Sequence, residues 1–199
     1  MIACEYSGKV RDAFSKKGHD AWSCDLRPTL SEMTKKEGKH LQGNVLKYIN
    51  DYWDLMIGFQ PCTYLSNVNT KWRGDLYRFK KAAEAMIFFT ELFDAPINKI
   101  ALENPVGMLN TCYRKPDQII HPYYFGGCEQ KRTCLWLKNL PKLKHSKTET
   151  LFSKRSHALL HDDFKNNKSN RQTKWYNNNK SQRSILFQSI ADAMANQWG

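Results

Sequence analysis

Residues 54–59 have the sequence Asp54-Leu55-Met56-Ile57-Gly58-Phe59. A short apolar run of this kind predicts a buried β-strand. Two similar runs come earlier, at Ile2-Ala3-Cys4 and at residues 21–24, and another comes later, at residues 99–102. Four strands are therefore expected in the first half of the chain.

Amphipathic segments lie between these predicted strands. Val10, Ala13 and Phe14 share one helical face. Between Leu76 and Phe93 apolar residues recur at helical spacing, which predicts a long helix. Strands that alternate with helices favour right-handed crossovers and a parallel sheet covered on both faces. The predicted fold class is α/β.

The composition changes after residue 137. Residues 138–182 carry 11 Lys and Arg against 3 Asp and Glu, so they hold +8 of the net charge of +12. This segment has no sustained apolar period, which predicts a basic, irregular stretch. Residues 184–198 regain an apolar helical face and predict a C-terminal helix that packs back onto the sheet. That face consists of Phe187, Ile190, Ala191, Met194, Ala195 and Trp198.

Length and charge restrict the class of protein. A chain of 199 residues fits a single domain, here taken as residues 1–199. A net charge of +12 favours a polyanionic partner, nucleic acid first and an anionic membrane second, although many basic proteins are simply solvated. The longest apolar run, Ala85 to Phe89, is too short to span a membrane, and no signal-peptide pattern is present. We expect a cytoplasmic protein without a membrane partner.

The six cysteines favour neither disulfides nor a metal site. No pair has Cys-x-x-Cys spacing, and no histidine cluster lies nearby, so no metal ligands are predicted. Buried free thiols are the ordinary state of cysteine in a cytosolic protein. Cys62 differs from the others in its surroundings.

Two polar segments follow the first two predicted strands. Cys4-Glu5-Tyr6-Ser7-Gly8 leads into a helix, whose first backbone amides could face a carboxylate or a phosphate. Asp25 ends the second strand, where an acidic residue commonly accepts hydrogen bonds from ribose hydroxyls. A plain strand-to-helix turn and a turn-forming Asp before Pro28 fit the same residues.

Two further segments follow the third and fourth of these strands. In the stretch from Gln60 to Asn67, Pro61 fixes a backbone angle and presents Cys62 on a rigid loop. Cys62 fits a nucleophile if nearby charge stabilises its thiolate, and it equally fits a small buried hydrophobe. Glu103-Asn104-Pro105 places a carboxylate at a strand end, or forms a simple turn.

Pro61-Cys62 after one strand and Glu103-Asn104-Pro105 after the next resemble the DNA (cytosine-5) methyltransferase family. The likeness is to its short phage- and prophage-encoded members, and it runs from end to end of the chain. It implies a Rossmann-like class I S-adenosylmethionine-dependent methyltransferase fold. It also implies that a phage-encoded protein would be located in the cytoplasm of the bacterial host. The similar stretches are residues 3–8, 61–65, 102–105, 133–141 and 191–199.

The resemblance also implies a reaction and a role for each residue. Carbon 5 of cytosine is a weak nucleophile until a thiolate adds to carbon 6 and makes an enamine. Cys62 would be that thiolate, and Glu103 would hold ring nitrogen 3 and the exocyclic amine. Arg132 would stabilise the bound pyrimidine, although a solvated pair Lys131-Arg132 fits as well. The residues expected to contact S-adenosylmethionine are Glu5, Tyr6, Ser7, Gly8, Asp25, Asn44 and Pro61.

The chain departs from the family in three places. The glycine-rich loop is reduced to Ser7-Gly8, and Asn44 stands where the family usually has an acidic residue. Residues 138–182 replace a large target-recognition domain, which predicts phosphate attraction with low sequence specificity in DNA. The alternatives are a catalytically silent nucleic-acid-binding protein and a different carbon-5 pyrimidine modification. Retention of Cys62 and Glu103 favours an enzyme.

Overall fold

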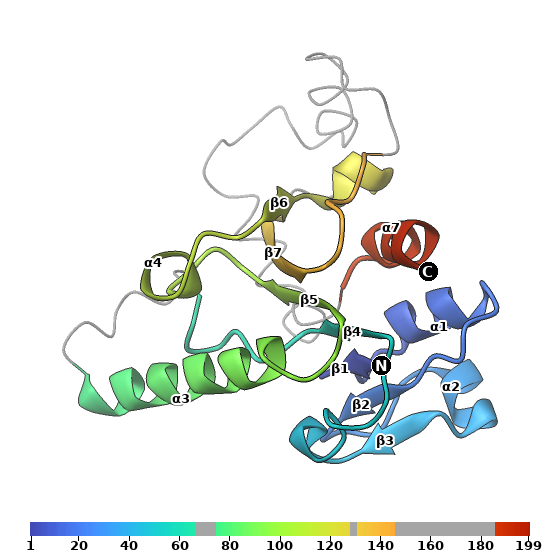
Figure 1. Cartoon of the computed structure of the whole chain (residues 1–199), viewed down its shortest axis with the longest axis horizontal. Helices are drawn as coiled ribbons and strands as arrows, with labels where there is room; N and C mark the ends of the chain where they lie inside the picture. Colours follow the sequence, from blue (N-terminus) through green and yellow to red (C-terminus); the bar gives the residue numbers. More distant parts are fainter. Residues whose placement is uncertain (67–74, 128–130, 146–185) are drawn as a thin grey trace, which may run out of the picture.

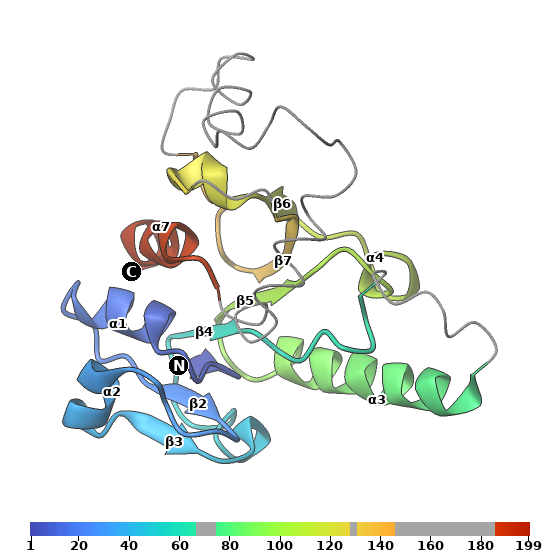
Figure 2. The ribbon, with the colours of Figure 1, turned by 180° about the vertical axis from the view of Figure 1, so that it is seen from behind.

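The computed structural model describes residues 1–66, 75–127, 131–145 and 186–199. Its fold is α/β, with one seven-stranded sheet and helices on both faces (Figures 1 and 2). The strands are β1 (Ile2–Ala3), β2 (Ser23–Asp25), β3 (His40–Gln42), β4 (Leu55–Gly58), β5 (Lys99–Asn104), β6 (Gln118–Ile120) and β7 (Thr133–Lys138). The helices are α1 (Lys9–Ser15), α2 (Glu32–Glu37), α3 (Leu76–Phe93), α4 (Leu109–Cys112) and α7 (Gln188–Trp198), with the 3-10 turns η1 (Val45–Lys47) and η3 (Pro122–Phe125).

The strand order in the sheet is β3-β2-β1-β4-β5-β7-β6. Strands β1 to β5 pair in parallel, as the alternation of strands and helices predicts. Strand β7 is antiparallel to both of its neighbours. It enters between β5 and β6 because the chain folds back through η3 after β6. The expected parallel sheet is therefore present from β3 to β5, and the pairing is antiparallel at the edge formed by β7 and β6.

The sheet separates two hydrophobic clusters, one on each face. Ile2, Ile57 and Leu135 lie on the face covered by α1 and α7. Their chain neighbours Ala3 and Met56 lie on the face covered by α3. Successive strand residues point to opposite faces, so each buried strand needs apolar side chains on both sides. This explains why the central strands have apolar runs in place of alternation.

The two longest helices agree with their sequence patterns. Helix α3 spans Leu76–Phe93, and the Asp75 side chain accepts a hydrogen bond from the Arg78 amide at its start. Helix α7 spans Gln188–Trp198 and packs against α1, with Ile190 and Met194 fully buried. The predicted C-terminal helix is confirmed over these residues.

The predicted basic segment is only partly described. Its first residue, Lys138, belongs to strand β7. Residues 146–182 lie outside the described residues, as do residues 184–185 of the expected C-terminal helix. No helix in the described ranges is long and apolar enough to cross a membrane.

Candidate functional site

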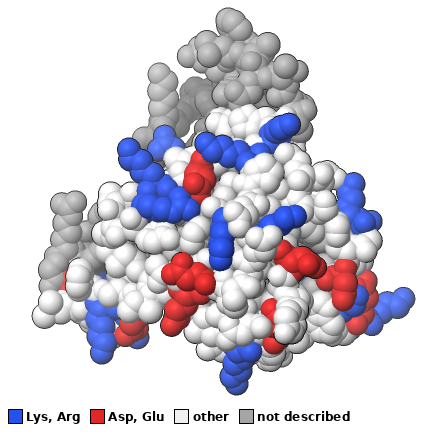
Figure 3. Space-filling model, viewed as in Figure 1, with Lys and Arg blue, Asp and Glu red and all other residues white. Residues whose placement is uncertain are grey.

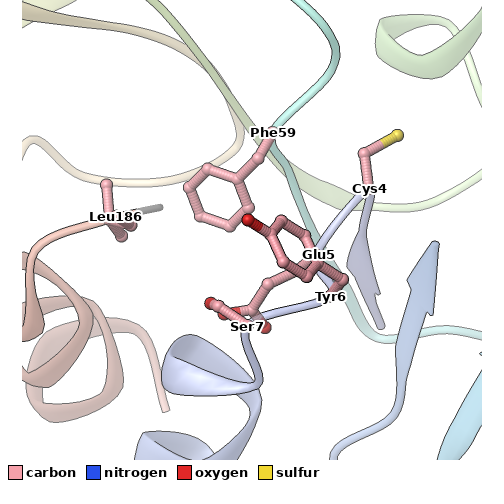
Figure 4. Close-up of a pocket in the computed structure, with 6 residues that line it drawn as sticks. All are labelled: Cys4, Glu5, Tyr6, Ser7, Phe59 and Leu186. Atoms are coloured by element: carbon pink, nitrogen blue, oxygen red, sulfur yellow. The ribbon is translucent and has the colours of Figure 1, made fainter. Parts of the chain in front are cut away.

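A small hollow lies at the carboxyl ends of β1 and β4. It is lined by Cys4, Glu5, Tyr6 and Ser7 after β1, by Phe59 after β4, and by Leu186 before α7 (Figure 4). β1 connects to β2 on one side and pairs with β4 on the other, so this is the point at which the strand order reverses. Ligands of open α/β sheets bind at such a point. The cavity volume is about 10 Å³, far below the 300–1,000 Å³ typical of ligand pockets.

The Glu5 carboxylate binds the start of helix α1. It accepts hydrogen bonds from the Val10 amide at 2.8 Å, the Arg11 amide at 3.2 Å and the Ser7 hydroxyl at 3.0 Å. Burial nevertheless raises the pKa of Glu5 to about 7. The first amides of α1, which the sequence suggested for a ligand anion, are thus bonded within the protein.

Gly8 is required at the start of α1 for two reasons. Its φ is +76°, a left-handed conformation that glycine adopts easily. An added Cβ would also overlap the side chain of Ser31, the residue that caps helix α2. Gly8 therefore allows the two helices to approach each other, whatever its relation to a ligand.

Asp25 and Asn44 both hold local turns. The Asp25 carboxylate, 10% exposed, accepts a hydrogen bond from the Arg27 amide at 2.9 Å. The Asn44 side chain accepts one from the Leu46 amide at 3.1 Å and caps η1. The Arg27 guanidinium lies 3.5 Å from the centre of the Tyr6 ring. These residues share the carboxyl edge of the sheet with the hollow, and their contact with a cofactor stays a prediction.

The loop after β4 holds Cys62 at the same edge. Pro61 is exposed and Cys62 is half-buried. The Cys62 carbonyl accepts hydrogen bonds from the Leu65 and Ser66 amides at 3.1 and 3.0 Å, which close a tight turn. The Leu65 carbonyl accepts one from the Met108 amide at 2.8 Å. A Cβ on Gly107 would overlap that carbonyl, so the glycine permits close contact between the loops after β4 and β5.

Glu103 lies in β5, near the end of the strand. It faces the α7 side of the sheet, since it alternates with Leu102 and Asn104 along the strand. Its Oε1 atom is buried and has no hydrogen-bond partner among the described residues. Burial raises the pKa of the Glu103 carboxyl, and the nearby positive charge of Lys131 opposes that rise.

Cys62, Glu103 and Lys131 interact electrostatically. Burial raises the pKa of the Cys62 thiol, the charge of Glu103 raises it further, and the charge of Lys131 lowers it. Cys62 and Glu103 lie 41 positions apart in the sequence. The structure thus brings this thiol and this carboxyl to the same edge of the sheet. A thiol, a carboxyl and an ammonium group at one strand edge can carry out nucleophilic addition and proton transfer.

Arg132 acts on a different thiol from that on which Lys131 acts. Its side chain is exposed, and its charge acts on the buried Cys134. Lys131 is half-buried, and its Nζ lies 5.8 Å from the centre of the Phe187 ring at the start of α7. Adjacent residues of an extended chain point to opposite faces of the sheet. Lys131 is therefore the cation nearer to Cys62 and Glu103.

Other buried oxygen atoms near this edge lack a hydrogen-bond partner among the described residues. They belong to Gln60, Asn104 and Thr133. An unsatisfied buried polar atom costs about 1–3 kcal/mol, so such atoms are rare in folded proteins. Such atoms at the carboxyl edge of the sheet suit a site for a polar ligand, although the Asn104 side chain points to the opposite face from Glu103. In the sequence, Gln60 stood out by its place before Pro61, Asn104 by its place in Glu103-Asn104-Pro105, and Thr133 as the first residue of the family-like stretch 133–141.

No family model matches the chain, and no curated protein matches it. Within the described ranges, no three side chains of His, Cys, Asp or Glu come together as metal ligands, and Cys4, Cys24, Cys62, Cys112 and Cys134 are free thiols. The fold and the site define an α/β protein with a thiol and a carboxyl that interact electrostatically at the carboxyl ends of its central strands.

Proposed function

We propose that this protein transfers a methyl group from S-adenosylmethionine to carbon 5 of cytosine in DNA, with Cys62 as the covalent nucleophile. The observation that carries the proposal is the electrostatic coupling of Cys62 with Glu103 and Lys131. The likeness of the segments around Pro61-Cys62 and Glu103-Asn104-Pro105 to cytosine-5 methyltransferases gives the pair its reaction.

The first step is addition of the Cys62 thiolate to carbon 6 of the cytosine. A bond forms between Sγ and carbon 6, and the ring electrons move to nitrogen 3, which takes a proton. The product is an enamine whose carbon 5 is nucleophilic. Lys131 favours this step because its charge stabilises the thiolate. Bound S-adenosylmethionine supplies an electrophilic methyl group on a sulfonium sulfur.

Glu103 is the proton donor for nitrogen 3. A raised pKa keeps a carboxyl protonated at higher pH, which suits a general acid. Its buried, unpartnered Oε1 also suits a hydrogen bond with the base. Carbon 5 would then take the methyl group from the sulfonium sulfur, whose bond to the methyl carbon breaks, and S-adenosylhomocysteine would leave. In the last step a water molecule takes the proton of carbon 5, Sγ leaves carbon 6, and the nitrogen 3 proton returns to Glu103. The enzyme is then restored.

Asp25 and the aromatic rings of the hollow have the chemistry that S-adenosylmethionine requires. Asp25 can accept bonds from ribose hydroxyls, and the Phe59 and Tyr6 rings flank the hollow with apolar surface (Figure 4). Its room is small, and its wall includes Leu186, the first described residue before α7. Binding of S-adenosylmethionine therefore requires Leu186 to move out of the hollow.

A polyanionic substrate agrees with the surface charge. On the face shown in Figure 3, Lys and Arg side chains gather over the half that carries β6, β7 and α4, whereas most acidic side chains lie in the other half. Phosphate contacts from such a surface attract DNA without reading its sequence. A base in duplex DNA would have to flip out of the stack to reach Cys62, at a cost of a few kcal/mol.

The small hollow and the bonded α1 amides favour one other function, a nucleic-acid-binding protein without activity. Mass analysis of nucleosides separates the two. DNA from cells that express the protein should contain 5-methylcytosine, and DNA from cells that express Cys62→Ala should contain only the background amount. DNA binding without any 5-methylcytosine would support the silent binder, and another modified cytosine would identify a different carbon-5 reaction.

Lys131→Met should slow the reaction of Cys62 with iodoacetamide at neutral pH by about tenfold. Loss of a nearby positive charge raises a thiol pKa by one unit or more, and only the thiolate reacts. Arg132→Met should have a much smaller effect because that side chain is exposed and acts on Cys134. Peptide-resolved mass spectrometry over a pH series measures the rate at Cys62 alone. Equal effects of the two variants would contradict the assignment to Lys131.

A further inference from the structure

Gln60 connects the Cys62 loop to strand β5. Its side chain is buried, with 3% of the residue exposed. Its Nε2 donates a hydrogen bond to the Glu103 carbonyl oxygen at 3.0 Å. The main-chain carbonyl oxygen of Gln60 accepts a hydrogen bond from Asn104 Nδ2 at 3.4 Å. Two hydrogen bonds thus join the residue two positions before Cys62 to Glu103 and its neighbour.

These bonds lie where the backbone pairing of β4 and β5 ends. The last paired residues of the two strands are Gly58 and Leu102. The Phe59 amide donates to the Ala3 carbonyl at 2.9 Å, on the other side of β4, in the same alternation as the bond from the Ile57 amide to the Met1 carbonyl. The Gln60 side chain therefore continues the link between β4 and β5 beyond their last paired residues.

Leu102 requires the glycine at position 58, and Gln60 packs beside both residues. A Cβ at Gly58 would overlap the Leu102 side chain and would lie 3.7 Å from Gln60 Oε1. Gln60 Oε1 is itself buried without a hydrogen-bond partner among the described residues. Burial of an unsatisfied oxygen lowers the stability of the protein. The buried Gln60 side chain is therefore more readily explained by the segments that its amide group holds together.

We propose that Gln60 is a positioning residue, which fixes the distance between Cys62 and Glu103 by tying the loop after β4 to the end of β5. The inference rests on the proposed function for its effect on turnover. Its effect on Cys62 itself does not depend on methyl transfer. A nucleophile and an acid on two separate strand ends need such a tie because a displacement of about 1 Å can cost a hundredfold in rate.

The test is Gln60→Met, which keeps the length of the side chain and removes the amide. The loosened loop should carry Cys62 toward solvent and away from both Glu103 and Lys131. Lost burial and the lost Glu103 charge lower the thiol pKa, and these two larger effects outweigh the rise from the lost Lys131 charge. Alkylation of Cys62 by iodoacetamide at neutral pH should become several-fold faster. Single-turnover methyl transfer should become at least tenfold slower, with little change in the apparent affinity for DNA. Opposite changes in these two rates are the mark of lost positioning.

Gln118→Met is the matched control. Gln118 also bonds main-chain atoms, donating to the Leu143 carbonyl and accepting from its amide, both at 2.8 Å, but it lies at the far edge of the sheet. It should lower stability and leave both Cys62 rates unchanged. The buried Cys24 gives an internal control, because faster alkylation there would indicate general unfolding.

A second variant, Gln60→Glu, covers the case in which Gln60→Met does not fold. Its carboxyl can donate to the Glu103 carbonyl only when protonated, so the wild-type Cys62 reactivity should return at low pH and be lost as pH rises. The proposal is overturned if the variants that fold leave the alkylation profile of Cys62 unchanged. If wild-type protein transfers no methyl group but Gln60→Met still speeds alkylation, the proposed function fails and the positioning role stands.

Discussion

Cys62→Ser will form no denaturation-resistant adduct with DNA that contains 5-fluorocytosine, whereas the wild-type protein will form one in the presence of S-adenosylmethionine. The last step of the reaction removes the hydrogen on carbon 5 as a proton. A fluorine in its place cannot leave as a cation, so the intermediate stays attached to the protein through Sγ. A serine hydroxyl is not ionised to a useful extent at neutral pH and is a much weaker nucleophile than a thiolate. The loss should be complete, as measured by denaturing gel electrophoresis.

Binding of DNA by Cys62→Ser should remain close to that of the wild type, because charge and shape elsewhere carry it. Cys112→Ser is the matched control. Cys112 is a free, exposed thiol at the end of α4, and its replacement should leave the adduct intact. An adduct formed by Cys62→Ser would show that another residue attacks the base.

Glu103→Gln should lower the single-turnover rate by about 100-fold or more, in the range for loss of a positioned acid or base. Glutamine has nearly the same shape and can still donate a hydrogen bond to the base. It cannot give up a proton to nitrogen 3, so the enamine forms slowly. Rapid-quench measurement with excess enzyme isolates this step from product release.

The same variant should change Cys62 in the opposite direction. Where Glu103 is ionised, its charge disfavours the thiolate, so Glu103→Gln lowers the pKa of the thiol and speeds its alkylation. Glu91→Gln, an exposed position on α3, should change neither rate. An unchanged single-turnover rate in Glu103→Gln would remove Glu103 from the chemistry and leave it as a strand-end residue.

Local sequence patterns were enough to predict the central fold. The apolar runs at residues 54–59 and 99–102 predicted β4 and β5, because a strand that is buried on both faces needs apolar side chains at successive positions. The stripe from Leu76 to Phe93 predicted the whole of α3, because helical spacing is a property of neighbouring residues. Pro61-Cys62 and Glu103 were recognisable because each directly follows or ends such a run.

Only the tertiary structure decided what these residues contact. Glu5 binds the amides of Val10 and Arg11, although its place after β1 had suggested a ligand contact. Lys131, rather than Arg132, is the cation whose charge acts on both Cys62 and Glu103. Gln60 meets Glu103 across 43 residues of sequence. Strand pairing and side-chain facing are long-range properties, set by which strands lie together, so no local period of the sequence could contain them.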